Sequence, residues 1–481
     1  MRYFEIACIS ILIIFNVTSC GYQLEDNLIG RSSEPGPPII SLVVPSDGSR
    51  IDSSMNQIDI TFSEEVTGAD SSSNYVLSGQ GVGSLTIVSV SSLGSNSYRI
   101  SVTGTPGDGT ITLTINNIVD SDGTGLQDNT IGYIGCWNAD WLYRRRLIFD
   151  NSGQSENLIN FPVLFKLNSS RINYSSTQNS GQDLRFLDGD RTELSYEIEE
   201  WNESGESFVW VKVPQIDASS SSDYIWMYYG NSGANDNQDS AGVWSNGYLG
   251  VWHLKESSAG TSAGKIYEDS TGNNDADDEV LAAGKDGQIG YGQEFNGFGD
   301  VIESNSYSYY FSSEITLSAW FKYSGSGNGS PRILEISLDG DANSQCLAPD
   351  GDGSLRAWIE QNGGGRLGAV DDGNDYWENA DPQWHYMVYT FNNSIPDPRA
   401  RLYVDGNQTD TGTGSSSNIE DGPYFVIGAV SDGSGNYSHG EHCFEGFVDE
   451  VRVSNTARSA DWIAAQYDSM DDNFITYGSE E

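Results

Sequence analysis

Paired carboxylates are the first residues of this chain that could do chemistry. The segment 197–200 reads Glu-Ile-Glu-Glu. Alternate residues of a strand share a face, so Glu197 and Glu199 would lie roughly 6.6 Å apart along it. Two carboxylates at that distance suit hydrolysis of a glycosidic bond only if a cleft holds the sugar between them. Without such a cleft the pair is an acidic strand face, which is the interpretation that we prefer.

The other acidic and histidine-containing segments also give little support for catalysis. Asp449 and Glu450 are neighbours on an expected strand, so their carboxylates should point to opposite faces and cannot form a dyad. His253 and His385 each follow a tryptophan, where a place in the core or on a strand face is expected. A Gly-rich loop explains His-Gly-Glu-His-Cys at 439–443 more simply than a soft-metal site. We therefore expect a protein that is not an enzyme.

Acidic residues greatly outnumber basic ones. The chain has 69 Asp and Glu against 23 Lys and Arg, which gives a net charge of −46. Such a surface repels nucleic acids and anionic lipid headgroups, so we expect no nucleic-acid partner. It offers many hard oxygen ligands that suit Ca²⁺, and a solvated surface without a specific ion explains the same composition.

Short strands between turns must position these residues. The chain contains 55 Gly residues, and helix-forming runs of Ala, Leu, Glu and Lys are nearly absent. This composition predicts an all-β protein. At 481 residues, and with roughly 100–200 residues for a domain, about three domains are expected.

The first twenty residues have the pattern of an export signal. Arg2 precedes an apolar stretch at 6–17 that is too short to span a bilayer. The stretch ends in Val-Thr-Ser-Cys at 17–20, which resembles the lipobox of bacterial lipoproteins. The resemblance implies a signal peptide over 1–19, lipidation of Cys20 and a tether over 20–38. It also implies an exported protein whose N-terminal lipid is anchored in the cell envelope, and Gly21 in place of a retention Asp favours the outer membrane.

Residues 39–134 are expected to form a first β-sandwich. Segments of alternating polarity, such as Ile-Asp-Ile-Thr-Phe at 58–62, are separated by turns rich in Gly, Asn and Ser. The order of Pro-x-Asp-Gly at 45–48, Asn-Tyr-Val-Leu at 74–77 and Ile-Val-Asp-x-x-Gly at 118–123 resembles the bacterial Ig-like domain of surface-layer and adhesin proteins. The resemblance implies a spacer.

Two further families are indicated by ordered motifs. Residues 137–252 carry Trp-x-Tyr-Arg at 141–144, Asp-Leu-Arg-Phe at 183–186 and Tyr-Tyr-Gly-Asn at 228–231, and are similar to the domain of unknown function DUF2341, which implies another β-sandwich. Residues 253–481 carry Phe-Asn-Gly at 295–297, Gln-Trp-His-Tyr at 383–386 and Val-Asp-Glu-Val-Arg-Val at 448–453. This segment resembles the LamG-like, concanavalin A-like jelly rolls, with a closing short helix.

Export would leave three cysteines in an oxidising compartment. Cys8 leaves with the signal and Cys20 takes lipid, so Cys136, Cys346 and Cys443 remain. Three pairings are possible. Because Cys346 and Cys443 share the C-terminal domain, we favour a disulfide between them. No C-x-x-C spacing supports metal ligation.

The jelly-roll resemblance also implies a calcium site, since folds of this kind often hold one Ca²⁺. Asp269 and Asp449 are the candidate ligands, because both belong to family motifs and the first and last strands of a jelly roll can lie side by side. Asp300 is a further candidate. Ca²⁺ needs six to eight oxygen ligands, so backbone carbonyls and water would complete the site.

Loops and strands of the jelly roll also offer rings on which apolar sugar faces can stack. The candidate ligand-binding residues are Trp358, Tyr376 and Trp377, with Asp371, Asp372 and Asp375 nearby. A place for Trp358 in the core is the alternative. We expect a surface lipoprotein that binds a glycan, or a matrix-type or surface-protein ligand. The alternatives are a purely architectural envelope or stalk protein and, third, a polysaccharide-degrading enzyme.

The lipobox predicts that replacing Cys20 with Ala releases the protein from membranes. A short uncleaved apolar segment holds weakly, whereas several acyl chains, at about 0.8 kcal/mol for each buried CH₂, hold firmly. Fractionation after a high-salt wash measures the release, with the unchanged chain as the control. Retention of the Cys20→Ala protein in the membrane fraction would show that lipid is not the anchor.

Overall fold

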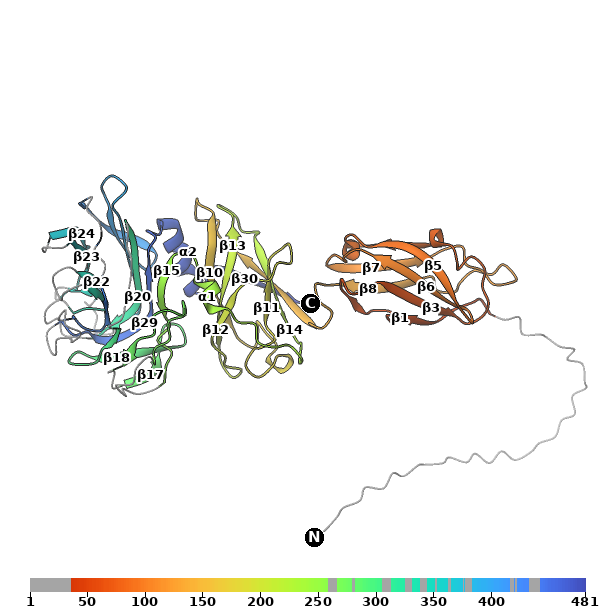
Figure 1. Cartoon of the computed structure of the whole chain (residues 1–481), viewed down its shortest axis with the longest axis horizontal. Coiled ribbons are helices and arrows are strands. Elements are labelled where there is room, and N and C mark those ends of the chain that lie inside the picture. The colour runs from red at the N-terminus through yellow and green to blue at the C-terminus, as the bar shows by residue number, and fades with distance from the viewer. Residues whose placement is uncertain are drawn as a thin grey trace, which may run out of the picture. The chain divides into compact units, whose positions relative to one another are not determined.

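The computed structural model describes residues 36–257, 266–278, 282–304, 313–324, 331–337, 344–350, 353–361, 365–374, 376, 383–415, 419, 422–431 and 442–481. The chain divides into two compact units, Met1–Asn138 and Ala139–Glu481. Nearly every element in Figure 1 is a β-strand, which confirms the predicted all-β, multidomain fold. Cys20 and the first part of the tether lie outside the described residues. Among the described residues, no helix is long and apolar enough to cross a membrane.

The first unit is a sandwich of two four-stranded sheets. One has the order β1 (Ile40–Val44), β3 (Gln57–Phe62), β6 (Ser97–Thr103) and β5 (Thr86–Gly94). The other has the order β2 (Arg50–Ile51), β8 (Thr130–Gly135), β7 (Gly109–Ile115) and β4 (Tyr75–Ser78), with 3-10 turns η1 (Ser72–Asn74) and η2 (Gln80–Val82) between strands. Alternate residues of each strand face the core, as Ile58, Ile60 and Phe62 do on β3.

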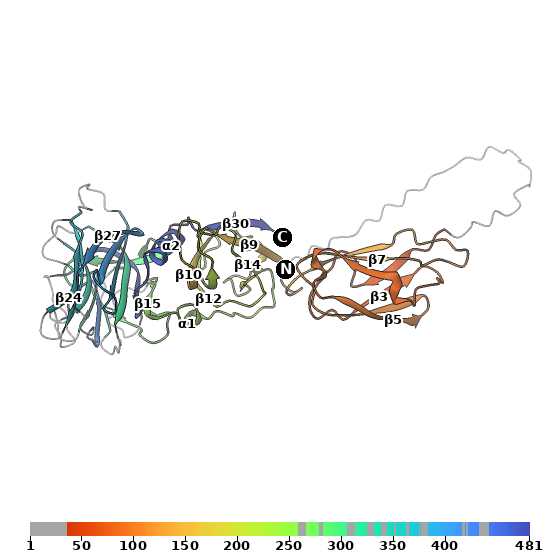
Figure 2. The ribbon, with the colours of Figure 1, turned by 90° about the horizontal axis from the view of Figure 1, so that it is seen from above.

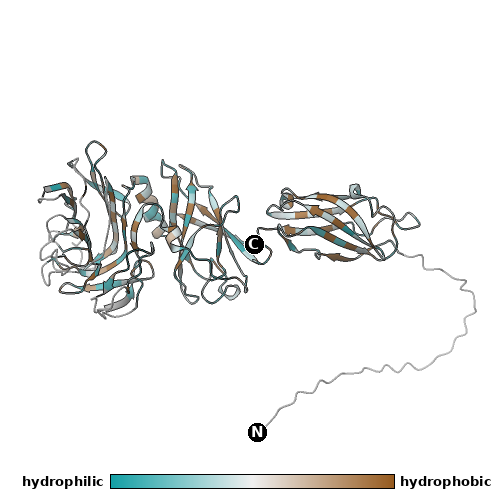
Figure 3. Ribbon diagram, viewed as in Figure 1, coloured by the Kyte–Doolittle hydropathy of each residue, from teal (hydrophilic) through white to brown (hydrophobic). Residues whose placement is uncertain are grey.

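The second unit begins with a seven-stranded sandwich. Its two sheets are β10 (Leu158–Leu167), β13 (Ser207–Ile216) and β12 (Tyr196–Glu200), and β11 (Arg185–Leu187), β14 (Tyr224–Tyr229), β9 (Tyr143–Phe149) and β30 (Ile475–Glu480). The 3-10 turn η3 (Tyr174–Ser176) and the short helix α1 (Ser240–Val243) lie in its connections. Hydrophobic residues, brown in Figure 3, recur along the strands of this sandwich, and the buried ones form one apolar core.

The jelly roll packs two larger sheets against each other. The eight-stranded sheet contains β17 (Ala282–Asp286), β18 (Tyr291–Asn296), β29 (Glu445–Ser454), β20 (Glu314–Tyr323), β25 (His385–Asn392), β26 (Ala400–Val404) and β27 (Asn407–Gly412), with β15 (Tyr248–Trp252) paired to β29. The seven-stranded sheet contains β16 (Asp277–Asp278), β19 (Ile302–Ser304), β28 (Tyr424–Ile427), β21 (Leu334–Ser337), β22 (Ser344–Pro349), β23 (Leu355–Gln361) and β24 (Gly365–Asp371).

The end of the chain ties the jelly roll to the preceding sandwich. Helix α2 (Ala460–Met470) is capped by Ser459, whose side chain accepts from the amide of Trp462, and it packs between β10 and β27 (Figure 2). Trp462 enters the core of the sandwich, 4.7 Å from Phe161 between ring centroids. Strand β30 then pairs with β9, at the edge of a sandwich sheet. The jelly-roll segment predicted at 253–481 therefore returns its last strand to the sandwich, and β15, placed before residue 253, pairs within the jelly roll.

Candidate functional site

The outer face of the seven-stranded sheet carries a hollow of about 390 Å³, a volume at the lower end of the range typical of small-ligand sites. It is lined by Arg356, Trp358, Arg366, Ala369, Val370 and Asp371. Strands β23 and β24 place Arg356 opposite Asp371 and Trp358 opposite Ala369. Alternation sends Ala357 to the other face, into the jelly-roll core. The structure thus brings two of the predicted ligand-binding residues, Trp358 and Asp371, to one hollow.

The ring of Trp358 lies between two guanidinium groups. Arg332 lies 4.5 Å from the ring centroid and Arg366 lies 4.6 Å from it, so both are within reach of cation–π attraction. The predicted stacking of a sugar on this ring is therefore possible only if Arg366 moves. Trp358 is 4% exposed and packs with Cys346 and Ala348. It is buried, as the alternative held, but on the outer face of the sheet rather than in the main core.

The other predicted contacts have mainly local partners. Asp371 Oδ2 accepts from Arg356 Nε at 2.8 Å. Tyr376 donates to Asp372 Oδ2 at 2.7 Å, while Asp372 Oδ1 accepts from the amide of Leu355 at 3.1 Å, so this pair closes a turn. Asp375 and Trp377 lie outside the described residues. Of the six predicted residues, two line the hollow.

The predicted calcium ligands have separate sets of donors. Asp269 accepts from the amides of Val251 and Thr271, at 2.8 and 3.0 Å. Asp449 Oδ2 accepts from the amides of Gln288 and Ile289, both at 2.9 Å. Asp300 Oδ2 accepts from the amide of Asn296 at 3.0 Å. These hydrogen bonds supply donors that compensate each carboxylate for the water it loses on burial. The Ca²⁺ site stays a prediction.

The predicted disulfide is wrong for this structure. Cys346 is fully buried on β22 and packs against Ala348 and Trp358. Cys443 instead packs beside Val301, and its thiol donates to a backbone carbonyl at 3.5 Å. The described residues contain no disulfide bond. Membership of one domain does not bring two cysteines together when they occupy different apolar clusters.

A second candidate site is buried where the sandwich meets the jelly roll. His253 Nδ1 lies 2.5 Å from Glu450 Oε1 and 3.5 Å from Glu199 Oε2, while Nε2 lies 3.4 Å from Glu197 Oε2. Arg452 donates to Glu450 from Nε, at 3.2 Å, and also from Nη2. All five side chains are buried. We call these five residues the junction cluster.

Neighbouring polar groups complete the junction cluster. Trp210 Nε1 donates to Glu199 at 2.7 Å, and Trp244 Nε1 donates to Glu197 at 2.8 Å. Ser270 Oγ donates to the other oxygen of Glu197 at 2.7 Å. The guanidinium of Arg452 also lies 4.4 Å from the ring of Trp210. Indole, hydroxyl and guanidinium donors thus replace the water that these carboxylates lose on burial.

Strand alternation positions most of the junction cluster. On β12, Tyr196 and Ile198 pack on the sandwich core, so Glu197 and Glu199 share the opposite face, as predicted, but the jelly roll covers that face. Trp252 and Leu254 enter the jelly-roll core, and His253 between them faces the sandwich. The sequence had no signal that these faces would meet, since each strand belongs to a different domain.

A β-bulge supplies Glu450 and corrects one expectation. The register between β20 and β29 shifts between Ser318 and Trp320, and Glu450 has a φ of 53°. The extra residue breaks alternation. Val448 and Val451 both reach the core, and Asp449 and Glu450 both stay out of it. The prediction that their carboxylates point to opposite faces was therefore wrong. Burial, and then the negative charge of Glu450, raise the pKa of Asp449.

Burial and charge shift the junction carboxylates in different directions. Burial, and then the charge of Glu450, raise the pKa of Glu199 to about 8. Burial opposes ionisation of Glu197 and Glu450, but His253 together with the neighbouring cations and hydrogen-bond donors outweighs it and lowers each pKa to about 2. Burial alone would lower the pKa of His253, and the charges of Glu450, Glu197 and Glu199 raise it well above its usual value. The cluster is thus balanced near neutral pH, with Glu197 and Glu450 ionised against His253 and Arg452.

The same residues include a group with metal-binding side chains. One ligand atom from each of Glu199, His253 and Glu450 lies within 4.8 Å of the others. Two ligand atoms of one Zn²⁺, each at about 2.0–2.2 Å, are separated by roughly 3 Å or more. The 2.5 Å between His253 Nδ1 and Glu450 Oε1 is a direct charge-assisted hydrogen bond. This geometry fits an ion-pair network better than a metal centre.

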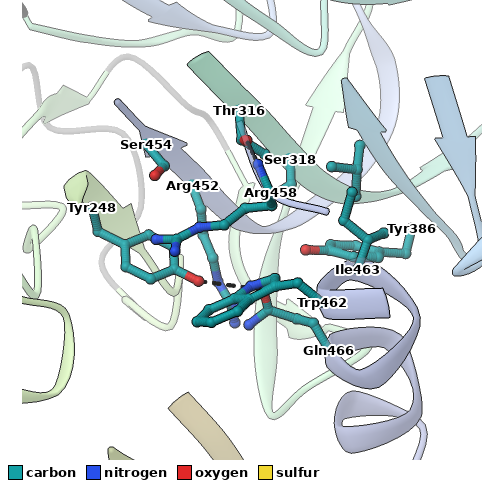
Figure 4. A pocket seen from close by; sticks show the side chains of 11 residues that line it. Tyr248, Thr316, Ser318, Tyr386, Arg452, Ser454, Arg458, Trp462, Ile463 and Gln466 are labelled. Atoms are coloured by element: carbon teal, nitrogen blue, oxygen red, sulfur yellow. Dashed lines mark hydrogen bonds between the residues drawn. The ribbon is translucent and has the colours of Figure 1, made fainter. Parts of the chain in front are cut away.

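A small cavity adjoins the junction cluster, between α2 and the eight-stranded sheet (Figure 4). Its volume is about 10 Å³, which suits a single water-sized group. Figure 4 shows Arg452, Arg458 and Gln466 turned towards it. No saccharide fits there, so the hollow on the outer face is the better candidate for ligand binding.

Two known protein families match parts of this chain. Residues 295–464 match a family described as the concanavalin A-like lectin/glucanases superfamily, Laminin_G_3. Residues 180–275 match the domain of unknown function DUF2341. The chain therefore carries two of the three domains that its motifs resemble, the LamG-like domain and the DUF2341 domain. A comparison with curated proteins gives no significant match.

Solved structures share parts of the fold at low similarity. Domain 4 of the arabinanase AbnA from Geobacillus stearothermophilus, in complex with arabinotriose, is 18% identical over 46% of this chain and 98% of its own, with a TM-score of 0.33. The CBM40 of a Ruminococcus gnavus sialidase, bound to α2,6-sialyllactose, is 13% identical over 37% and 96%, with a TM-score of 0.28. A Limulus polyphemus pentraxin is 16% identical over 36% and 79%, at 0.29. At these scores the likeness does not identify a ligand.

The junction cluster predicts that stability falls as pH rises above about 5. The folded state holds the Glu199 proton up to about pH 8, whereas the unfolded chain releases it near 4.5. The folded chain therefore binds more protons in this window, and its free energy of unfolding falls by about 1.4 kcal/mol per pH unit for each differing proton. His253, with its raised pKa, adds a loss of the same sign above pH 6.5. Below pH 4.5 the sign reverses, because Glu197 and Glu450 stay ionised in the fold to about pH 2.

Glu199→Gln tests this assignment, since glutamine mimics the protonated acid at every pH. We expect the variant to match the parent near pH 5 and to exceed its melting temperature at pH 8–9. Thermal unfolding across pH measures the difference, with Glu203→Gln, at an exposed position, as the control. Parallel pH profiles for the Glu199→Gln and parent proteins would show that Glu199 is ionised in the fold.

Proposed function

We propose that this chain is an exported, lipid-anchored protein that binds saccharides through the hollow of its jelly roll and does not catalyse. The observation that carries the proposal is the convergence of Arg356, Trp358, Arg366 and Asp371 on one hollow of a concanavalin A-like domain. Guanidinium, indole and carboxylate groups together supply donors and an acceptor for sugar hydroxyls. The family description, which includes lectins, supports the same class of ligand.

Burial of the acidic residues supports binding without hydrolysis. A glycosidase needs two carboxylates on either side of the scissile bond, in a cleft that admits sugar and water. Glu199 and Glu450 have fully buried side chains and already bind Trp210 and Arg452. A polysaccharide could reach them only if the two domains separated, so their shifted pKa values favour a structural role.

The buried contact between the sandwich and the jelly roll also supports the alternative of a purely architectural protein. The sandwich covers one face of the jelly roll, and α2 fills the space beside it. A rigid two-domain unit on a lipid tether suits a stalk. Ligand retention separates the two functions, because a stalk binds no small ligand.

A glycan array probed with residues 36–481 tests the proposed function. We expect retention on a restricted set of saccharides, and we expect Arg356→Gln, which removes a charged donor from the hollow, to weaken it by about ten- to a hundred-fold, the loss expected for a hydrogen bond to a charged group. Arg401→Gln, on β26 of the other sheet, is the matched control and should bind as the parent does. Absence of retention on every saccharide would favour the stalk.

A further inference from the structure

The hollow offers hydrogen-bond donors in excess of acceptors. Arg356, Trp358 and Arg366 donate only, and Asp371 is the one carboxylate among the lining residues. Both oxygens of Asp371 already accept, Oδ2 from Arg356 at 2.8 Å and Oδ1 from the amide of Gly373 at 3.3 Å. A ligand that suits this lining must therefore supply acceptor oxygens more than hydroxyl donors.

Trp358 gives the second, independent indication of an acceptor. Within the described part of the chain, its Nε1 is buried and has no hydrogen-bond partner. A buried donor without an acceptor costs about 1–3 kcal/mol, so such groups are rare unless they face a ligand or solvent molecule. The indole lines the hollow between the two guanidinium groups of Arg332 and Arg366.

Arg366 is the group best placed to meet a ligand. Its side chain is 54% exposed, and its Nε lies 3.5 Å from Glu360 Oε1. Arg332, on the other face of Trp358, is 3% exposed and is held by Glu335 at 3.3 Å. One guanidinium is therefore fixed below the ring and the other can reorient above it. Planar guanidinium groups bind carboxylates in a two-pronged geometry that few other side chains provide.

We propose that the hollow binds a saccharide through a single carboxylate, as on a uronic acid residue, with Arg366 and Trp358 Nε1 as its donors. This inference rests on the proposed function and names the class of sugar. The net charge of −46 repels polyanions. Charges beyond about 8 Å are screened at physiological salt, so one carboxylate is governed by the local donors, whereas a densely charged polymer meets the repulsion of the whole surface.

The test uses pairs of oligosaccharides that differ only by a terminal uronic carboxylate in place of a primary alcohol. Residues 36–481 are titrated calorimetrically with both members of each pair. We expect the acidic member to bind and the neutral member to bind at least about tenfold more weakly, as expected when a charge-assisted hydrogen bond is lost. Equal affinity overturns the carboxylate inference and leaves the proposed function intact. Failure of every oligosaccharide to bind overturns both.

Variants of the same chain test the residues. Arg366→Gln should lower affinity for the acidic member about tenfold or more and leave the neutral member unchanged. Arg401→Gln, on β26 of the other sheet, is the matched control and should bind as the parent does. Unchanged binding by Arg366→Gln overturns the assignment. Acetate that competes as well as free glucuronate would show a simple anion site, and would overturn the saccharide part of the inference.

Discussion

Burial of ionised side chains between two domains is the constraint on which this architecture depends. Removing a carboxylate from water costs several kcal/mol, and only a close partner of opposite charge with further hydrogen bonds repays it. Glu197 and Glu199 come from the sandwich, whereas His253, Glu450 and Arg452 come from the jelly-roll side. Without the other domain, each of these two sets of side chains would carry a net charge that nothing balances. The pairing therefore specifies how the two domains meet.

Apolar packing around the cluster extends the same junction. Phe208 and Trp210 of the sandwich share an apolar cluster with Trp320 and Tyr386 of the eight-stranded sheet and with Ile463 of α2. One outer face of the jelly roll is thereby covered. The outer face of the seven-stranded sheet carries the hollow around Trp358, so one sheet joins the domains and the other carries the hollow that we propose as the ligand site. The fixed junction gives that second sheet a rigid support.

Local sequence patterns predicted much of this fold. They could not predict which segments far apart in the chain would pair. Alternation on β12 correctly placed Glu197 and Glu199 on one face, and ordered motifs indicated both domains. The partner of that face could not be inferred, because no local pattern states which domain surfaces meet. The bulge at Glu450 broke the alternation rule, and β30 crossed back to β9 over more than three hundred residues of chain.

The proposed ligand site was likewise predicted only in part. Trp358 and Asp371 were predicted from residue type, and the structure brings them to one hollow. The flanking arginines were not predicted. Arg366 lies eight positions along the chain from Trp358, and only the β23–β24 register brings it near the ring. The scarcity of arginines in this acidic chain could have drawn attention to these residues. Their spacing in the sequence, however, does not show that they lie on the same face of the sheet as Trp358.

Scanning calorimetry of residues 36–481 tests most directly whether the sandwich and the jelly roll form one unit. The junction predicts a single cooperative transition for residues 139–481, with a calorimetric enthalpy equal to the van't Hoff enthalpy, beside a separate transition for the first unit. Separate transitions for the sandwich and the jelly roll, or a van't Hoff enthalpy well below the calorimetric one, would contradict this account.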